Sequence, residues 1–237
     1  NHANNPINPN IKKGSNNMLS LNYLTIKQFS VLTGIHFTTK MNGKMEGLQS
    51  LSTSVLENPH CQERRKQGNT ICAHCFAASQ MKCYKSMVKC FKENTEILTT
   101  QLFPVEEMPI INTLYFRFES FGDLINETQA INYFNICKKN PAVKFALWTK
   151  NPWIIERAIK AGNEKPENLQ IVLSSPILNK AIEEKAVSKY PFIDKIFTVY
   201  DKEESKNVNI NCGAKKCLTC GLCYNKNEVR YINETLK

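Results

Sequence analysis

Short apolar segments alternate with helical ones between residues 48 and 211, and this alternation limits the possible folds more than any other feature of the chain. The expected strands, which are rich in β-branched and aromatic residues, span 48–56, 112–118, 143–149, 169–174, 193–200 and 208–211. Helical periodicity and terminal signals predict helices at about 75–101, 126–139, 152–161 and 179–189. Strands that alternate with helices favour parallel βαβ units over a sandwich. Right-handed crossovers then build either a closed or partly closed barrel or a doubly wound sheet.

No internal repeat and no linker divides the chain, so a single domain is expected. Residues 1–47 are predicted to form an N-terminal arm and lead-in, residues 48–211 the βα core, and residues 212–237 a cysteine-rich extension that binds a metal or cluster. The first 18 residues are polar and rich in Asn, Pro and Lys, which is typical of a tail. Residues 19–33 fit a strand pair or a short helix, and periodicity does not decide between the two.

The composition is that of a globular protein. With 42% hydrophobic residues among 237, the chain has enough apolar side chains for a sizeable core. No apolar run reaches the ~18 residues of a membrane span, and no segment resembles a signal peptide, so a cytoplasmic protein with no membrane partner is expected. The net charge of +10 indicates a polyanion partner such as nucleic acid or, equally, a lysine-rich solvated surface.

The ten cysteines are clustered, which favours metal ligation in a reducing compartment over disulfides. The first group, Cys61, Cys72 and Cys75, follows the first predicted strand. Three thiolates fit one cluster or one metal ion and leave a coordination position open, which is the arrangement of a catalytic site. The alternative is a zinc site that His60 or His74 completes.

The second cysteine group lies directly after the last predicted strand. Its four members fall within twelve residues: Cys212, Cys217, Cys220 and Cys223. Four thiolates make a closed site, and the compact spacing is more typical of an iron–sulfur cluster than of zinc, which usually takes two separated pairs. Zinc remains the alternative at this site.

Polar residues stand where several predicted strands end. Glu119, Ser120 and Asp123 follow the second strand, Lys150 follows the third, and Ser174 ends the fourth. In a parallel βα barrel these positions share one face with both cysteine groups, and that face carries active sites. Serine at such a place also suits a helix cap. Glu119 and Lys150 are poor caps, which makes them the candidate catalytic residues.

Three motifs carry a resemblance to a known family. CAHCFA at 72–77, FRFESFGD at 116–123 and ALWTKN at 146–151 resemble the phage gene product 88 family, over about residues 48–223. The order of a cysteine loop, an acidic motif and terminal cysteines also resembles the radical S-adenosylmethionine (SAM) enzymes. That resemblance implies a parallel partial (βα)6 TIM-like barrel of radical SAM type, with a cysteine-rich C-terminal extension.

The resemblance also implies roles for these residues. Cys61, Cys72 and Cys75 would bind a [4Fe–4S] cluster whose open iron holds SAM. Glu119, Ser120 and Asp123 would bind the amino group of SAM, while Lys150 and Ser174 would lie near its carboxylate and ribose. The terminal cysteines would hold a second cluster.

The implied activity is reductive cleavage of SAM followed by hydrogen abstraction from an unknown substrate. It requires an electron donor, and in so short a chain a macromolecular substrate would complete the cavity. The host cytoplasm is the expected location of a phage or mobile-element protein. Two departures from the radical SAM pattern are the ten-residue gap after Cys61 and the Glu-Ser-Phe-Gly-Asp motif in place of Gly-Gly-Glu. The alternative function is a non-catalytic metal- or cluster-binding protein that binds nucleic acid through its basic surface.

Overall fold

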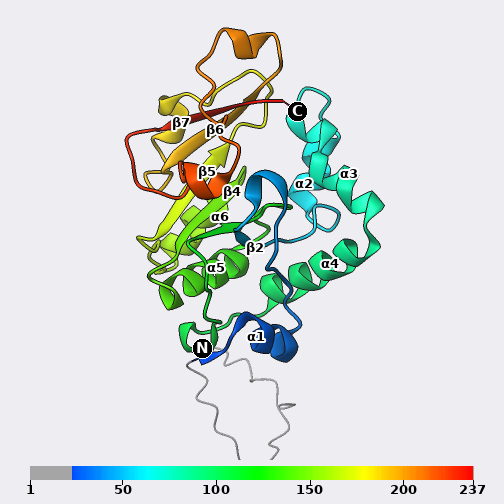
Figure 1. Ribbon diagram of the computed structural model, residues 1–237, viewed down its shortest axis with the longest axis vertical. Coiled ribbons are helices and arrows are strands. Elements are labelled where there is room, and N and C mark those ends of the chain that lie inside the picture. Colours follow the sequence, from blue (N-terminus) through cyan, green and yellow to red (C-terminus); the bar gives the residue numbers. More distant parts are fainter. Residues whose placement is uncertain (1–22, 237) are drawn as a thin grey trace, which may run out of the picture.

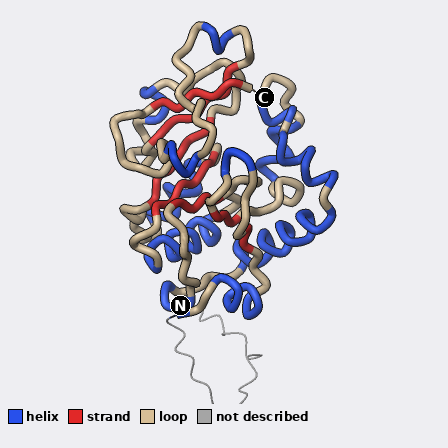
Figure 2. Tube along the Cα trace, viewed as in Figure 1, coloured by secondary structure: helices blue, strands red, loops and turns tan. Residues whose placement is uncertain are grey.

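The computed structural model describes residues 23–236 as an α/β protein built on one seven-stranded sheet (Figures 1 and 2). The strands follow one another across the sheet in chain order. They are β1 (Phe37–Thr38), β2 (Gln49–Leu51), β3 (Tyr115–Phe118), β4 (Lys144–Thr149), β5 (Leu169–Ser174), β6 (Lys195–Tyr200) and β7 (Tyr231–Thr235). All neighbours from β2 to β7 are parallel, and β1 is antiparallel to β2.

Helices occupy most of the connections between the strands. They are α1 (Ile26–Thr33), α2 (Pro59–Arg65), α3 (Phe76–Cys83), α4 (Lys85–Thr100), α5 (Glu127–Lys139), α6 (Pro152–Lys160), α7 (Glu184–Val187) and α8 (Cys217–Cys220). Two short 3-10 helices, η2 (Gly43–Met45) and η3 (Ile71–His74), also belong to the connections. Within residues 23–236 no helix combines the length and the apolarity that a membrane crossing requires.

The expected partial TIM-like barrel is wrong, because the sheet is open. Its two edges are β1 and β7, and they do not pair with each other. Closing a barrel needs edge strands long enough to pair and tilted into register. Here β1 has only two residues and runs antiparallel to its neighbour, which suits an edge rather than a closing strand. The prediction of parallel βαβ units is correct from β2 to β6.

One side of the sheet, here called the helix side, packs against α4, α5 and α6. Sequential strand order with right-handed crossovers places successive helices on the same side. Phe116 and Phe118 of β3, with Phe145 of β4, form an aromatic group with ring centroids 5.2 to 5.4 Å apart. Tyr133 of α5 stacks on Phe118 at 4.3 Å. This side forms the main hydrophobic core.

The opposite side, here called the far side, is covered in part by the cysteine-rich segment. Tyr224 stacks on Tyr115 of β3 with ring centroids 4.8 Å apart and meets Trp148 of β4 edge-on. Leu48 and Ala146 complete this smaller cluster. The far side is therefore only partly filled, which leaves room for a cavity toward the carboxyl ends of the strands.

Several predicted elements differ from the structure, beginning with the strand expected over 48–56, which is shortened to β2. The helix expected over 75–101 is broken at Tyr84 into α3 and α4, and the helix expected over 179–189 is reduced to α7. Residues 208–211 do not form a strand, and the sheet instead gains β7 from the chain after the cysteines. Tyr231–Thr235 takes the edge position because all five of its residues pair in parallel with β6, from Ile196 to Tyr200. Of residues 19–33, the described part includes α1, so the helix rather than the strand pair is present there.

Candidate functional site

A cavity of about 290 Å³ opens at the carboxyl ends of the strands, on the far side of the sheet. Eight residues predicted from the sequence line it together: Cys61, Cys72, Cys75, Glu119, Ser120, Asp123, Lys150 and Ser174. They come from α2, η3, the start of α3 and the ends of β3, β4 and β5. Leu236 also lines this cavity, and Figure 1 shows the C-terminal end beside α2 and α3.

The loop after β2 is fixed by Asn58, which is fully buried. Its Oδ1 accepts hydrogen bonds from the backbone N–H groups of His60 at 2.9 Å and Cys61 at 3.2 Å, which caps α2. Its Nδ2 donates to the carbonyl of Asp123 at 2.8 Å. One side chain therefore sets the position of the first cysteine relative to the turn after β3.

The three cavity cysteines are partly buried. Burial raises the pKa of Cys61 and of Cys72, while Lys150 opposes the shift at both and Arg64 opposes it at Cys72. Within residues 23–236, no three side chains of His, Cys, Asp or Glu converge as a ready-made metal site. The thiols and the cations near them are suited to a thiolate site. To bind one metal ion or cluster, the cysteine side chains would have to rotate until their sulfurs point to one position.

Asp123 fastens the β3 end to the β4 end. Its Oδ1 accepts from Thr149 Oγ1 at 2.5 Å and from the Leu124 N–H at 2.8 Å, and its Oδ2 accepts from the Lys150 N–H at 2.9 Å. The Arg64 guanidinium lies 3.8 Å from Oδ2. The carboxylate oxygens are thus engaged by the protein itself, which gives Asp123 a structural role beside any contact with a ligand.

Glu119 is buried beneath the turn that follows β3 and has a positive φ of 54°. Its carboxyl group accepts from the Thr53 N–H at 3.2 Å, from Thr53 Oγ1, from Gln129 Nε2 at 2.7 Å and from the Tyr133 hydroxyl. Burial raises the pKa of Glu119 to about 8, and the hydrogen bonds from Tyr133 and Thr53 only partly oppose this. Glu119 therefore organises the cavity floor through a buried network.

Ser120 and Ser174 contribute hydroxyl groups to the cavity. Ser120 Oγ lies 2.8 Å from Ser52 Oγ and donates to Ser50 Oγ at 3.2 Å, so it is tied to the end of β2. Ser174 ends β5 on the far side, where its strand pairs with β6 at Phe197. Lys150 places its ammonium group near Cys61 and Cys72, and among the described residues that group forms no hydrogen bond.

Among the cavity residues to which the sequence pattern gave no role are Arg117 and Trp148. The Arg117 guanidinium stacks over the Trp148 ring at 3.9 Å from its centroid. An arginine at an alternate position of the otherwise apolar strand YFRF is the signal that could have identified it, because an interior strand rarely carries an unneeded charge.

The terminal cysteines surround a second, very small cavity. Cys212, Cys217, Cys220 and Cys223 all line it, together with Lys44 of η2. The Lys44 ammonium donates to Cys212 Sγ at 3.1 Å, to the Cys212 carbonyl at 2.9 Å and to Glu234 at 2.9 Å. Burial raises the pKa of Cys223 to about 12.

The two cysteine groups do not share one edge of the sheet, contrary to expectation. Tyr224, directly after the last cysteine, packs on Tyr115 at the start of β3, so this segment lies over the far side of the sheet. Residues 208–211 form no strand, and the cysteines stand in the long connection between β6 and β7 rather than after a strand end. Gly221 lets this connection pack tightly, since its φ is 62° and a Cβ there would stand 2.5 Å from the Tyr115 hydroxyl.

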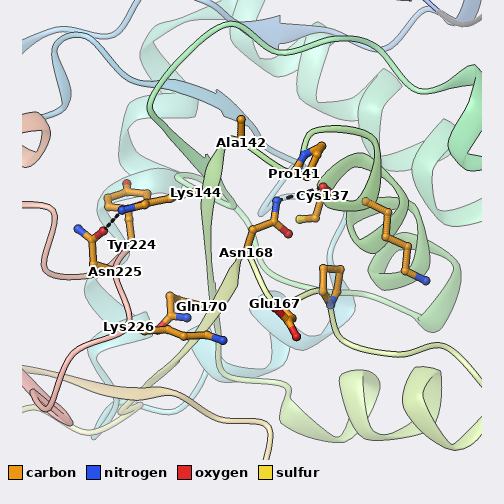
Figure 3. Close-up of a pocket in the computed structure, with 12 residues that line it drawn as sticks. Cys137, Pro141, Ala142, Lys144, Glu167, Asn168, Gln170, Tyr224, Asn225 and Lys226 are labelled. Atoms are coloured by element: carbon orange, nitrogen blue, oxygen red, sulfur yellow. Dashed lines mark hydrogen bonds between the residues drawn. The ribbon is translucent and has the colours of Figure 1, made fainter.

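A larger cavity of about 600 Å³ lies near the amino ends of β4 and β5 (Figure 3). Lys144 donates to Asn225 Oδ1 at 2.5 Å on one wall, and Asn168 donates to the Cys137 carbonyl at 3.1 Å on another. None of the residues predicted to be functional lines this cavity. In parallel sheets, ligands bind outside the carboxyl ends of the strands, so the smaller cavity is the better candidate.

Fold and site together define an open-sheet α/β protein with a cysteine-lined cavity at the carboxyl ends of its strands. A family profile described as Gene product 88 matches residues 38–231. The chain therefore belongs to the phage gene product 88 family, as its three motifs indicated. No curated protein and no solved structure matches it. The family match says nothing about iron–sulfur or SAM chemistry, so that expectation stays a prediction.

Proposed function

We propose that the protein is an iron–sulfur enzyme of radical SAM type that works in the cavity at the carboxyl ends of β2 to β6. The observation that supports this most is the grouping of Cys61, Cys72 and Cys75 with Lys150 around one cavity. Three thiols from the connection between β2 and β3 leave a coordination position for a ligand, whereas a structural site is closed by four. The order of the cysteine loop, the acidic motif and the terminal cysteines, which resembles that of radical SAM enzymes, adds to the proposal.

In this proposal Cys61, Cys72 and Cys75 would hold the cluster, which would supply the electron for reduction of a bound sulfonium compound when an external donor reduces it. Lys150 lies near Cys61 and Cys72, where its charge offsets that of the thiolates. Ser120 and Ser174 offer hydroxyls to the polar groups of SAM. Glu119 acts as a positioning residue, because its oxygens accept hydrogen bonds from Thr53, Gln129 and Tyr133 and hold the turn in place.

The test is cleavage of SAM by protein purified and reconstituted with iron and sulfide in the absence of oxygen. With dithionite as the electron donor, we expect release of methionine and 5′-deoxyadenosine from the wild type. Lys150→Met should lower this release at least about tenfold, the usual scale for loss of one positioned charge. Lys160→Met on α6 is the matched control, since Lys160 pairs with Glu156 on an exposed helix surface. Reconstituted protein that binds no SAM would contradict the proposal.

The terminal cysteines are proposed to bind a second metal group, either a cluster or zinc. Four thiols around one small cavity suit a closed, structural site. Bound there, the metal would fasten the cysteine-rich segment to η2, where Lys44 already joins Cys212 and Glu234.

The alternative of nucleic-acid binding has one structural feature in its favour. Phe76, which lines the cavity, is 70% exposed, and exposed lysines follow it on α3 and α4: Lys82, Lys85, Lys89 and Lys92. An aromatic ring beside a row of cations is a common binding surface for single-stranded nucleic acid. Binding that weakens steeply with salt and is insensitive to loss of the cavity cysteines would favour this alternative.

A further inference from the structure

Arg117 is a charged residue in the middle of an interior strand. β3 has neighbours on both sides, β2 and β4. Phe116 and Phe118 point to the helix side and enter the main core, while Arg117 points to the far side and lines the cavity. A charge at such a position is costly unless a partner compensates for it.

The protein supplies only weak partners for this guanidinium. Its plane stacks on Trp148, and its Nη1 lies 3.6 Å from the Met45 sulfur, which is a poor acceptor. Its Nε is buried and has no hydrogen-bond partner among the described residues. The thiols of Cys217 and Cys223 lie within range of its charge, but neither accepts a hydrogen bond from it. An arginine has five N–H donors, and almost all of those of Arg117 form no hydrogen bond with the described residues, so they are available to a ligand.

No carboxylate of the cavity is free to pair with Arg117. Asp123 accepts from Thr149 and from two backbone N–H groups and faces Arg64 at 3.8 Å. Glu119 is enclosed by its own donors beneath the turn. The cavity therefore holds two cations, Arg117 and Lys150, whose charges the neighbouring carboxylates do not neutralise.

We infer that Arg117 binds an anionic group, a carboxylate or a phosphate, of the ligand that enters this cavity. A guanidinium presents parallel N–H groups that fit such anions in a bidentate way, and the stack on Trp148 holds its plane in a fixed orientation. The inference rests on the proposed function only in taking this cavity as the ligand site. The anionic group has two possible sources, the carboxylate of SAM or an acidic group of the substrate.

Trp148 provides a direct readout for this inference. The chain has two tryptophans, so Trp153→Phe leaves Trp148 as the only one, at 3.9 Å from the guanidinium. In that background the reduced full-length protein is titrated with pyrophosphate at constant ionic strength, with chloride as the reference anion. We expect a saturable change in tryptophan emission.

Three variants make the titration specific. Arg117→Gln should weaken pyrophosphate binding at least tenfold, roughly the loss of one charge-assisted pair. Arg117→Lys keeps the charge but lacks the forked guanidinium, so its affinity for pyrophosphate should lie between those of the parent and of Arg117→Gln. Arg157→Gln is the matched control, because Arg157 lies on α6 and pairs with Glu127 on the other side of the sheet. It should bind like the parent.

The outcomes separate this inference from the proposed function. No saturable signal in the parent, or equal binding by Arg117→Gln, would overturn the role of Arg117. Competition between SAM and pyrophosphate would assign the anion to SAM, while simultaneous binding would assign it to the substrate. The signal does not require iron, so a chain that binds pyrophosphate but no cluster would refute the radical SAM proposal and leave this inference intact.

Discussion

Replacing Gly122 with alanine is expected to destabilise the protein by about 4 kcal/mol, the range of severe strain combined with overpacking. The φ of Gly122 is +87°, which a residue with a Cβ adopts at a cost. An added Cβ would also overlap Glu119 Oε2 and would stand 2.7 Å from the Thr53 carbonyl oxygen. Since both neighbours belong to the network under the cavity, the substitution should disturb the cavity as well as the fold. Urea unfolding followed by circular dichroism measures the change.

Gly162→Ala separates strain from overlap in that experiment. Gly162 has a similar φ of +92°, but a Cβ there would meet nothing within 4 Å. This control should cost about 1 kcal/mol, the contribution of the backbone conformation alone. Equal losses for the two variants would show that the close packing of Gly122 against Glu119 has no energetic consequence.

The second large expected effect is a fall in stability as the pH rises from about 5 to 7.5. The pKa of Glu119 is raised to about 8 in the folded protein by burial, from a value near 4.5. Between these values the folded protein keeps a proton that the unfolded chain has released. The stability that this proton contributes is therefore fully present below about pH 4.5 and is lost as the pH rises, by roughly 3 kcal/mol between pH 5 and 7.5. The free energy of unfolding at several pH values measures it.

Glu119→Gln is the control, because glutamine has nearly the same shape and does not titrate. The glutamine oxygen can still accept from Gln129 and Tyr133, but its NH2 group then faces the Thr53 N–H, so the variant is less stable at pH 5. The free energy of unfolding of this variant should change less with pH. The difference in stability between the variant and the wild type should therefore become smaller as the pH rises. Parallel curves for the two proteins would contradict the raised pKa of Glu119.

Sequence alone predicts the βα order of this fold well, because hydrophobic periodicity reports directly on burial. The strand predicted over 169–174 is β5 with the same ends, and all six of its residues are buried. The helix predicted over 126–139 is α5 with one residue removed. Local signals, such as the capping of the first turn of α5 by Asn126, determine where these elements begin and end.

Sheet closure and strand choice near the C-terminus were not predictable in the same way. Whether β1 and β7 meet depends on strand lengths and tilt across the whole sheet, which no local pattern reports. Residues 208–211 alternate much as a strand does, but Tyr231–Thr235 takes the place beside β6. Pairing partners decide between such segments, and they are distant in sequence.

The candidate site was predictable where its residues stand at strand ends. Lys150 and Ser174 follow strands that were recognised, so topology alone brings them to one cavity. Arg117 and Tyr133 were missed, because periodicity assigns one to a strand and the other to a helix without indicating which groups they contact. Their roles depend on contacts with Trp148 and Glu119, which only the folded structure shows.

The amounts of iron and sulfide per chain, measured in protein purified without oxygen, show whether the cavity cysteines hold a cluster. We expect Cys72→Ser combined with Cys75→Ser to lose about four irons relative to the wild type, the content of one [4Fe–4S] cluster. Cys83→Ser is the matched control, since Cys83 is exposed on α3 and does not line the cavity; it should keep all of its iron. The same iron content in all three proteins, or zinc without iron in the wild type, would contradict the account.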